Sequence, residues 1–177
     1  LSLKEFKKIY DLMDVDFEYM IGESQYVPMV KDIVNLLLEK KIAEKDKSGA
    51  IVVKFDEKGE NKLVIQKTDG TSLYSTRDIG TLIARKLWFK PIKILYLVGV
   101  EQKSYFEQIF KIYKRLADDE IPQLEHVYSG LIKLPEGRMS TRKGNVIFLE
   151  EFLEKSIDLA KEKIIKNNKD LLETALE

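Results

Sequence analysis

Ile92-Lys93-Ile94-Leu95-Tyr96-Leu97-Val98 is the stretch that decides the fold, because it is almost continuously apolar. A strand of this kind is typical of a parallel sheet that helices cover on both faces. Apolar residues at helical spacing predict a helix before it, from Ile79 to Leu87, and another after it, from Phe106 to Leu116. A second strand is expected at 126–134 and a last long helix at 149–164. This alternation of helices and strands predicts an α/β fold with a parallel sheet and crossover helices.

The residues that precede this α/β region predict a different arrangement. Apolar positions recur at helical spacing from Leu3 to Met13 and from Val30 to Leu38, and Gly22-Glu23-Ser24 reads as a break followed by a helix start. Two apolar runs, 51–55 and 63–67, flank a short polar loop and predict a β-hairpin. The first part of the chain is therefore expected to be helical with an inserted hairpin.

The composition excludes several classes of protein. The chain has 177 residues, of which 44% are apolar and 34% are charged, as in a globular protein. Lys+Arg and Asp+Glu number 30 each, so nucleic acid could be bound only through local basic patches. The sequence contains no cysteine, which excludes a disulfide framework. It contains one histidine, His126, which excludes a histidine-rich metal site. No apolar run approaches the ~20 residues that span a bilayer, so a cytoplasmic protein is expected.

A basic loop, Arg138-Met139-Ser140-Thr141-Arg142-Lys143-Gly144-Asn145, carries the clearest sign of a ligand. Its cations supply charge, its hydroxyls and backbone N–H groups supply short donors, and its glycine lets the backbone come close to a ligand. Apolar runs on both sides place the loop at a strand end, where open α/β sheets bind ligands. From composition alone, a polyphosphate site and an ordinary solvated basic turn are both open.

Three segments in this order resemble consecutive motifs of the arginyl-tRNA synthetases, which are class I aminoacyl-tRNA synthetases. They are Leu73-Tyr74-Ser75-Thr76-Arg77-Asp78-Ile79, Val98-Gly99-Val100-Glu101-Gln102 and Met139-Ser140-Thr141-Arg142-Lys143-Gly144. The last is similar to the KMSKS loop of that family, and the resemblance runs along nearly the whole chain. It implies ATP-dependent attachment of arginine to tRNA(Arg) through an arginyl-adenylate, with Mg²⁺ accompanying the ATP and no tightly bound cofactor.

The resemblance also implies how the chain is organised. Residues 1–72 would be an inserted segment of helices and a β-hairpin. Residues 73–177 would be the C-terminal half of a Rossmann-like nucleotide-binding catalytic domain, with its KMSKS-like loop and the start of the downstream helices. The HIGH-type motif of the family needs histidines, which this sequence does not place in that context. The first half of the catalytic domain and the anticodon-binding part are therefore expected elsewhere in the same chain, and this fragment alone is expected to fold but not to aminoacylate.

The resemblance implies that Tyr74, Asp78 and Gln102 bind substrate arginine. A guanidinium is planar and always charged, so the carboxylate of Asp78 is its natural partner. Tyr74 can pack on the substrate or hydrogen-bond to it, and Gln102 can bind the remaining polar groups. Ser75 and Asp78 also fit a capping box, in which Asp78 stabilises a helix start, and the two roles are compatible. Arg77 is interpreted as a structural ion-pair partner or an exposed residue.

The resemblance implies that ATP is bound by the predicted strand at 126–134 and by the basic loop that follows it. Arg138, Arg142 and Lys143 would stabilise the phosphates as the adenylate forms. The residues expected to contact ATP are Met139, Ser140, Thr141, Arg142, His126 and Gly130. His126 is equally compatible with a partly buried histidine that has ordinary hydrogen-bond partners. Both lysine positions of the KMSKS pattern are arginine here, and whether Lys143 or Lys133 supplies the missing ammonium is left open.

Two other functions remain open at the level of sequence. A noncatalytic paralogue could use this fold as a nucleotide-binding or regulatory module, and a tRNA-binding appendage could use the basic loop only to contact phosphate. Enzymes of the class that act on apolar amino acids are disfavoured, because Asp78 would stand unpaired beside an uncharged substrate.

Overall fold

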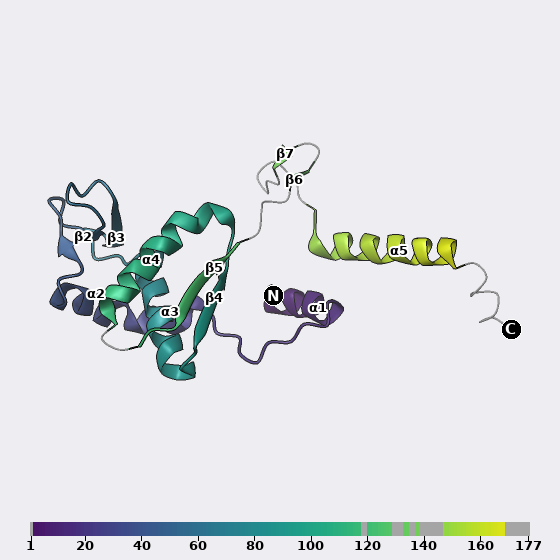
Figure 1. The fold of residues 1–177 in the computed structure, drawn as a ribbon, viewed down its shortest axis with the longest axis horizontal. Helices are drawn as coiled ribbons and strands as arrows, with labels where there is room; N and C mark the ends of the chain where they lie inside the picture. The colour runs from purple at the N-terminus through teal and green to yellow at the C-terminus, as the bar shows by residue number, and fades with distance from the viewer. Residues whose placement is uncertain (1, 118–119, 129–132, 135–136, 139–146, 169–177) are drawn as a thin grey trace. The chain divides into compact units, whose positions relative to one another are not determined.

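The computed structural model describes residues 2–117, 120–128, 133–134, 137–138 and 147–168 (Figure 1). The chain divides into two compact units, one of Ile21–Leu131 and the other of Leu1–Met20 with Ile132–Glu177. The division expected between residues 72 and 73 stays a prediction. Within the described ranges, no helix combines the length and the apolar character needed to cross a membrane.

The unit Ile21–Leu131 begins with helices and an antiparallel sheet. The elements are η1 (Glu23–Met29), α2 (Val30–Glu39), β1 (Glu44–Lys45), β2 (Ile51–Lys54) and β3 (Lys62–Gln66). The strands lie in the order β1-β2-β3, and both neighbouring pairs are antiparallel. The predicted helix start at Gly22-Glu23-Ser24 and the predicted hairpin are therefore confirmed. The sequence did not predict β1, because two residues are too few to show an alternation.

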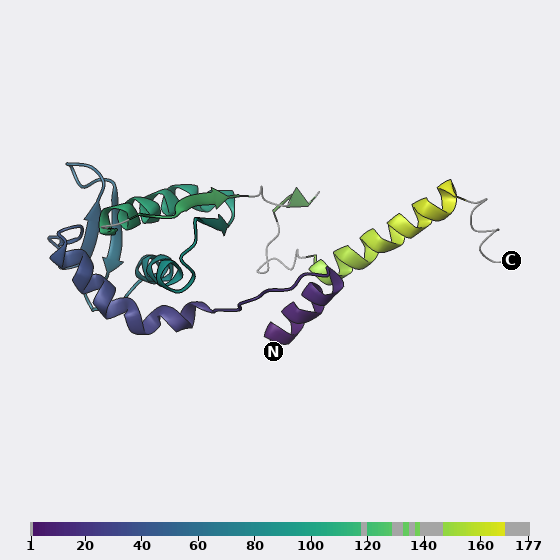
Figure 2. The same ribbon diagram turned by 60° about the horizontal axis from the view of Figure 1, so that its bottom comes forward.

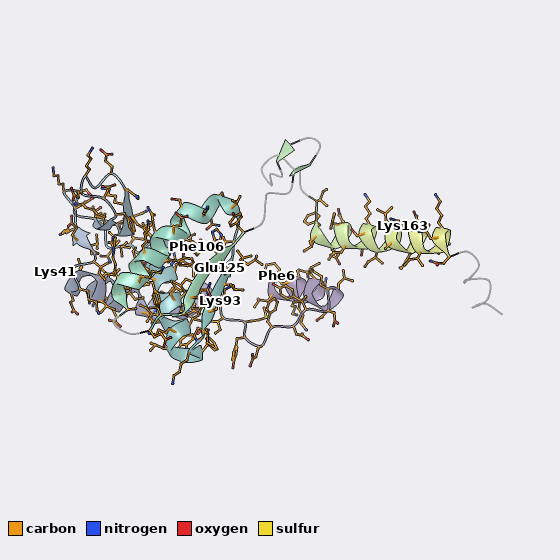
Figure 3. All side chains as sticks on the ribbon, viewed as in Figure 1. Phe6, Lys41, Lys93, Phe106, Glu125 and Lys163 are labelled. Carbon is orange, nitrogen blue, oxygen red and sulfur yellow. The ribbon has the colours of Figure 1, made fainter. Side chains whose placement is uncertain are left out.

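The same unit continues with the predicted α/β alternation, which is confirmed. The elements are α3 (Tyr74–Phe89), β4 (Lys93–Leu97), η2 (Val100–Gln102), α4 (Lys103–Leu116) and β5 (Gln123–Val127). Strands β4 and β5 are parallel and hydrogen-bonded in register, and α4 connects them (Figure 2). An ion pair between Lys93 and Glu125 crosses the two strands (Figure 3). The strand predicted at 126–134 is placed differently: β5 ends at Val127, and β6 (Lys133–Leu134) pairs with β7 (Gly137–Arg138).

Strand β4 corrects the expectation of a strand covered on both faces. Ile94 and Tyr96 are buried, whereas the alternate residues Leu95 and Leu97 are 56% and 79% exposed. The sequence is apolar on both faces, but the described residues cover only one of them. Apolar composition predicts that a strand can be buried on both sides, and it does not say which elements supply the cover.

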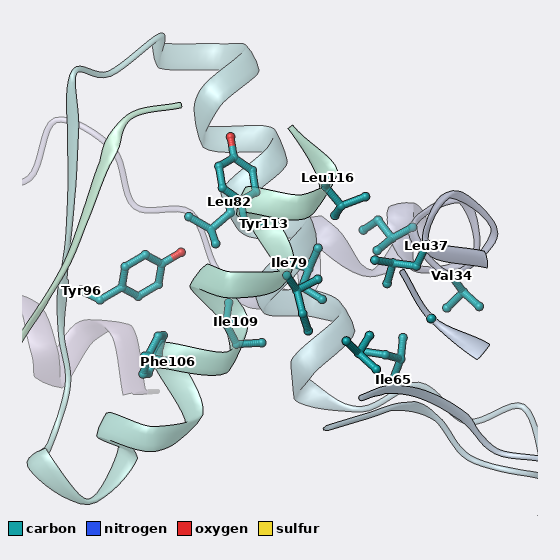
Figure 4. Close-up of a cluster of buried hydrophobic side chains, with 14 of the residues drawn as sticks. Val34, Leu37, Ile65, Ile79, Leu82, Tyr96, Phe106, Ile109, Tyr113 and Leu116 are labelled. Carbon is teal, nitrogen blue, oxygen red and sulfur yellow. The ribbon is translucent and has the colours of Figure 1, made fainter. Parts of the chain in front are cut away.

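Helix α3 lies at the centre of the core (Figure 4). Ile79 and Leu82 on this helix are completely buried, and α3 contacts α2, α4, β3 and η1. Leu37 of α2, Ile65 of β3 and Ile109 of α4 are buried in the same cluster. Because its neighbours surround it, α3 holds the residues of its first two turns in fixed positions.

The start of α3 is tied to strand β3 by two hydroxyls. Ser75 Oγ donates to the carbonyl of Val64 at 2.6 Å, and Thr76 Oγ1 donates to the carbonyl of Ile65 at 2.5 Å. The helix begins at Tyr74, and no side chain caps it. The capping-box interpretation of Ser75 and Asp78 is therefore wrong: Ser75 lies inside the helix and bonds to a strand.

Gly80 allows α3 to approach α2 closely, and this contact gives a first prediction. A Cβ at Gly80 would lie 2.6 Å from Cδ1 of the buried Ile33. Overpacking of this kind costs about 1–3 kcal/mol, and the better helix propensity of alanine offsets about 1 kcal/mol. Gly80→Ala is therefore expected to lower the free energy of unfolding modestly, as measured by urea denaturation.

The double variant isolates the steric contact. Ile33→Val removes the Cδ1 atom and should cost about 0.5–1.5 kcal/mol in the wild-type background. In the Gly80→Ala background the same change should cost less or become favourable, with a coupling of about 0.5 kcal/mol or more. Strictly additive effects would show that the two helices do not meet at this point.

The second unit contains α1 (Ser2–Leu12) and α5 (Leu149–Asn167), and both predicted helices are confirmed. Glu5 and Lys8, one turn apart on α1, form an ion pair at 2.9 Å. Helix α5 has no buried residue among those described, and Lys163 extends from it (Figure 3). This helix presents both its basic and its apolar side chains on its surface.

Candidate functional site

The carboxylate of Asp78 is the centre of the candidate site. Asp78 lies in the second turn of α3 and is half-buried, and its Oδ2 accepts a hydrogen bond from the hydroxyl of Tyr105 on α4. Tyr105 is half-buried as well. Asp78, the residue predicted to bind substrate arginine, is thus held between α3 and α4.

On balance, the surroundings of Asp78 disfavour its negative charge and raise its pKa. Burial raises the pKa of Asp78, and the nearby Glu23 carboxylate raises it further. The Tyr105 hydrogen bond and the guanidinium groups of Arg85 and Arg77 act in the opposite direction. Burial, followed by the contact with Asp78, raises the pKa of Tyr105, so that the phenol stays a neutral donor. The carboxylate therefore gains from any additional cation.

Tyr74, Arg77 and Glu23 lie together beside this carboxylate. Arg77 Nε is 3.1 Å from Glu23 Oε1, an ion pair without the alignment of a hydrogen bond. The Arg77 guanidinium carbon also lies 4.7 Å from the centroid of the Tyr74 ring, as in a cation–π contact. This confirms the interpretation of Arg77 as an ion-pair partner. Tyr74 is 67% exposed, and since it precedes Asp78 by four residues, the two share a side of α3.

Gln102 and His126 lie near the carboxyl ends of the two parallel strands. This position was predicted for Gln102, whereas His126 was expected at the start of its strand. Gln102 is the last residue of η2, the short helix that follows β4, and it is exposed. His126 lies in β5 with its Nε2 3.0 Å from the carbonyl oxygen of Val98. Its Nδ1 is buried and has no hydrogen-bond partner among the described residues. The interpretation of His126 as a histidine with ordinary partners thus holds for one ring nitrogen.

The basic loop falls largely outside the described part of the chain. The backbone of Arg138 pairs with Lys133 between β7 and β6. The predicted ATP-binding and catalytic residues outside the described ranges are Met139, Ser140, Thr141, Arg142, Lys143 and Gly130. Their roles remain predictions. Within the described ranges, no group of three His, Cys, Asp or Glu side chains could hold a metal ion.

Two residues of the site were missed from the sequence. Glu23 lies in the Gly22-Glu23-Ser24 turn, which the sequence analysis interprets only as a break and a helix start. Tyr105 had no signal beyond its place near the start of α4, three residues after Gln102. Its contact with Asp78 joins residues that are 27 apart in the chain, and helical spacing cannot reveal such a pair.

Comparisons with known proteins agree with the motifs. The family model described as "tRNA synthetases class I (R), catalytic domain" matches residues 1–177. Arginine–tRNA ligase of Halothermothrix orenii is 41% identical over 171 residues, which are 97% of this chain and 30% of that protein. The enzyme of Clostridium kluyveri is 40% identical over 171 residues, with the same two shares.

Solved structures show the same relationship. The arginyl-tRNA synthetase of Plasmodium falciparum superposes with a TM-score of 0.78 at 27% identity, over 98% of this chain and 28% of that one. That of Thermus thermophilus shares the fold at 17% identity, with a TM-score of 0.65 over 90% of this chain and 33% of that one. The chain spans about 30% of the length of the curated relatives it matches. It belongs to the family of class I arginyl-tRNA synthetase catalytic domains.

Proposed function

We propose that this chain carries the arginine pocket and the ATP loop of an arginine–tRNA ligase, which activates arginine as its adenylate and transfers it to tRNA(Arg). The observation that supports this most is the half-buried carboxylate of Asp78 with a neutral donor, Tyr105, on one oxygen. A desolvated carboxylate is costly without a cation, and a substrate guanidinium supplies one. In this proposal, residues 73–177 form the C-terminal half of a Rossmann-like catalytic domain.

The surrounding residues fit a pocket for a cationic amino acid. Tyr105 engages Oδ2, and Oδ1 together with the remaining lone pair of Oδ2 can accept two parallel N–H groups of a guanidinium. The Glu23 carboxylate adds negative potential, since it raises the pKa of Asp78. The exposed Tyr74 ring can pack against the substrate, and Gln102 stands at the strand end where the polar groups of a ligand would lie.

The basic loop would handle ATP. A carboxylate oxygen of arginine attacks the α-phosphorus, and pyrophosphate leaves in line with it as the adenylate forms. Negative charge grows on the leaving group, and the cations of Arg138, Arg142 and Lys143 would stabilise it. Mg²⁺ enters with ATP as part of the substrate. This part of the proposal is supported by the motif and by its position after the strand that contains His126.

The proposal is tested with the full-length protein that carries this sequence. ATP–pyrophosphate exchange in the presence of tRNA(Arg) is expected to require arginine, and citrulline should not replace it. Citrulline has nearly the shape of arginine but an uncharged urea group, so the comparison tests the carboxylate pocket. A protein that binds only RNA, with a steep dependence on salt and no exchange activity, would be a noncatalytic tRNA-binding module instead.

A further inference from the structure

We infer that Tyr105 is a positioning residue for substrate arginine: its hydroxyl fixes the Asp78 carboxylate in the orientation that receives the guanidinium. This inference rests on the proposed function, because it assumes that Asp78 binds arginine. It adds a residue from α4 to a pocket that the motifs had assigned to α3 and η2 alone.

The geometry makes Tyr105 a rigid support. Its ring meets that of Phe106 edge-on, with centroids 5.2 Å apart and an interplanar angle of 83°. Phe106 is itself buried against Tyr96 of β4, with the ring centroids 4.9 Å apart (Figure 4). The hydroxyl is therefore presented from a packed aromatic cluster, and not from a mobile side chain. An aspartate has few side-chain torsions, so one hydrogen bond from a fixed donor is enough to orient it.

The chemistry of the donor matters as much as its position. A cation hydrogen-bonded to Asp78 would neutralise the charge that the substrate needs and would compete with it. The two arginines that lower the pKa of Asp78 have other contact partners: Arg77 forms an ion pair with Glu23, and the guanidinium carbon of Arg85 lies 5.1 Å from the centroid of the Tyr96 ring. A phenol orients the carboxylate and leaves its charge in place. The site thus combines a fixed orientation with an unneutralised carboxylate.

The titratable groups that interact with Asp78 come from four elements. They are Glu23 from η1, Arg77 and Arg85 from α3, Tyr96 from β4 and Tyr105 from α4. Burial is the largest influence and raises the pKa of Asp78, while the hydroxyl of Tyr105 is the strongest influence that lowers it. Without this hydroxyl the pKa rises further, so that protonation of Asp78, and with it the loss of arginine binding, begins at a higher pH.

The test is Tyr105→Phe in the full-length protein, assayed by pyrophosphate exchange. We expect the KM for arginine to rise about 5- to 20-fold, which is at or below the lower end of the effect of losing a direct hydrogen bond to a charged group, because the hydroxyl acts on the substrate only through Asp78. The KM for ATP and the kcat should change less than about twofold. The pH below which the KM for arginine climbs should move upward. Tyr113→Phe, which removes a hydroxyl two turns further along α4, is the matched control and should leave the pH profile unchanged.

A double variant separates positioning from a general structural effect. In the Asp78→Ala background, where the hydroxyl has no side-chain acceptor left to orient, Tyr105→Phe should add nothing to the loss of arginine binding. The inference is overturned if Tyr105→Phe leaves both the arginine KM and its pH profile unchanged, or if it weakens arginine equally with and without the Asp78 carboxylate. If Asp78→Asn itself leaves the arginine KM unchanged, the proposed arginine pocket fails and this inference fails with it. Thermal unfolding midpoints of all variants show whether they are folded.

Discussion

Asp78→Asn is expected to lower kcat/KM for arginine activation by about 30- to 3,000-fold in the full-length protein. The carboxylate is half-buried between α3 and α4, and its pKa is raised because water is partly excluded. Removing one partner of a desolvated charge pair costs about 2–5 kcal/mol, because the other charge then lies unpaired. Here the unpaired charge would be the substrate guanidinium. Pyrophosphate exchange at varied arginine concentrations measures the effect.

Asparagine is the sharper choice than alanine at this position. It keeps the shape of the side chain and an oxygen that can accept from Tyr105, so that it removes the charge and little else. The preference for arginine over citrulline should therefore collapse in this variant. Asp158→Asn, at an exposed position on α5, is the matched control and should retain wild-type values. A wild-type kcat/KM for Asp78→Asn would remove Asp78 from the site.

The spacing of apolar residues predicted most of the fold, because the residues that recur at helical spacing are the ones that are buried in the core. Ile79 and Leu82 on α3 and Ile109 on α4 are completely buried, and each stood in a predicted stripe. Strand β5 begins at Gln123, three residues before the predicted strand. The prediction followed the apolar run after His126, and most of that run lies outside β5. The register of β5 is set by pairing with β4, from Lys93↔Gln123 onward, and hydrophobicity does not encode that pairing.

The candidate site shows a similar limit. The resemblance pointed to Asp78, but the local pattern around it also suggested a capping box, because a sequence does not mark where a helix begins. The structure starts α3 at Tyr74, and Ser75 then bonds to the carbonyl of Val64. Tyr105 could not be predicted at all, since its role depends on how α4 packs against α3. Asp78, the proposed substrate-binding residue, lies in a sequence motif. Tyr105, the residue proposed to orient it, can be recognised only from the tertiary contact between α4 and α3.

Arg142→Ala is expected to lower the kcat for arginine activation at least tenfold, with little change in arginine affinity. Arg142 belongs to the KMSKS-like loop, and its proposed role is to stabilise charge on the departing pyrophosphate. Loss of one preorganised stabilising group costs about 10²- to 10³-fold in rate in well-studied enzymes. In the proposed site, arginine binds at Asp78 and Arg142 acts only as the adenylate forms, so the loss should fall on kcat and not on the KM for arginine.

Arg142→Lys tests what kind of cation the loop requires. The KMSKS pattern has a lysine at this position, so a point charge should restore most of the kcat if the role is electrostatic. If the forked geometry of arginine is essential in this protein, Arg142→Lys should be nearly as slow as Arg142→Ala. Lys111→Ala, at an exposed position on α4, is the control for loss of a surface cation and should leave kcat unchanged. An Arg142→Ala variant with wild-type kcat, or one whose loss lies in the KM for arginine, would contradict the assignment.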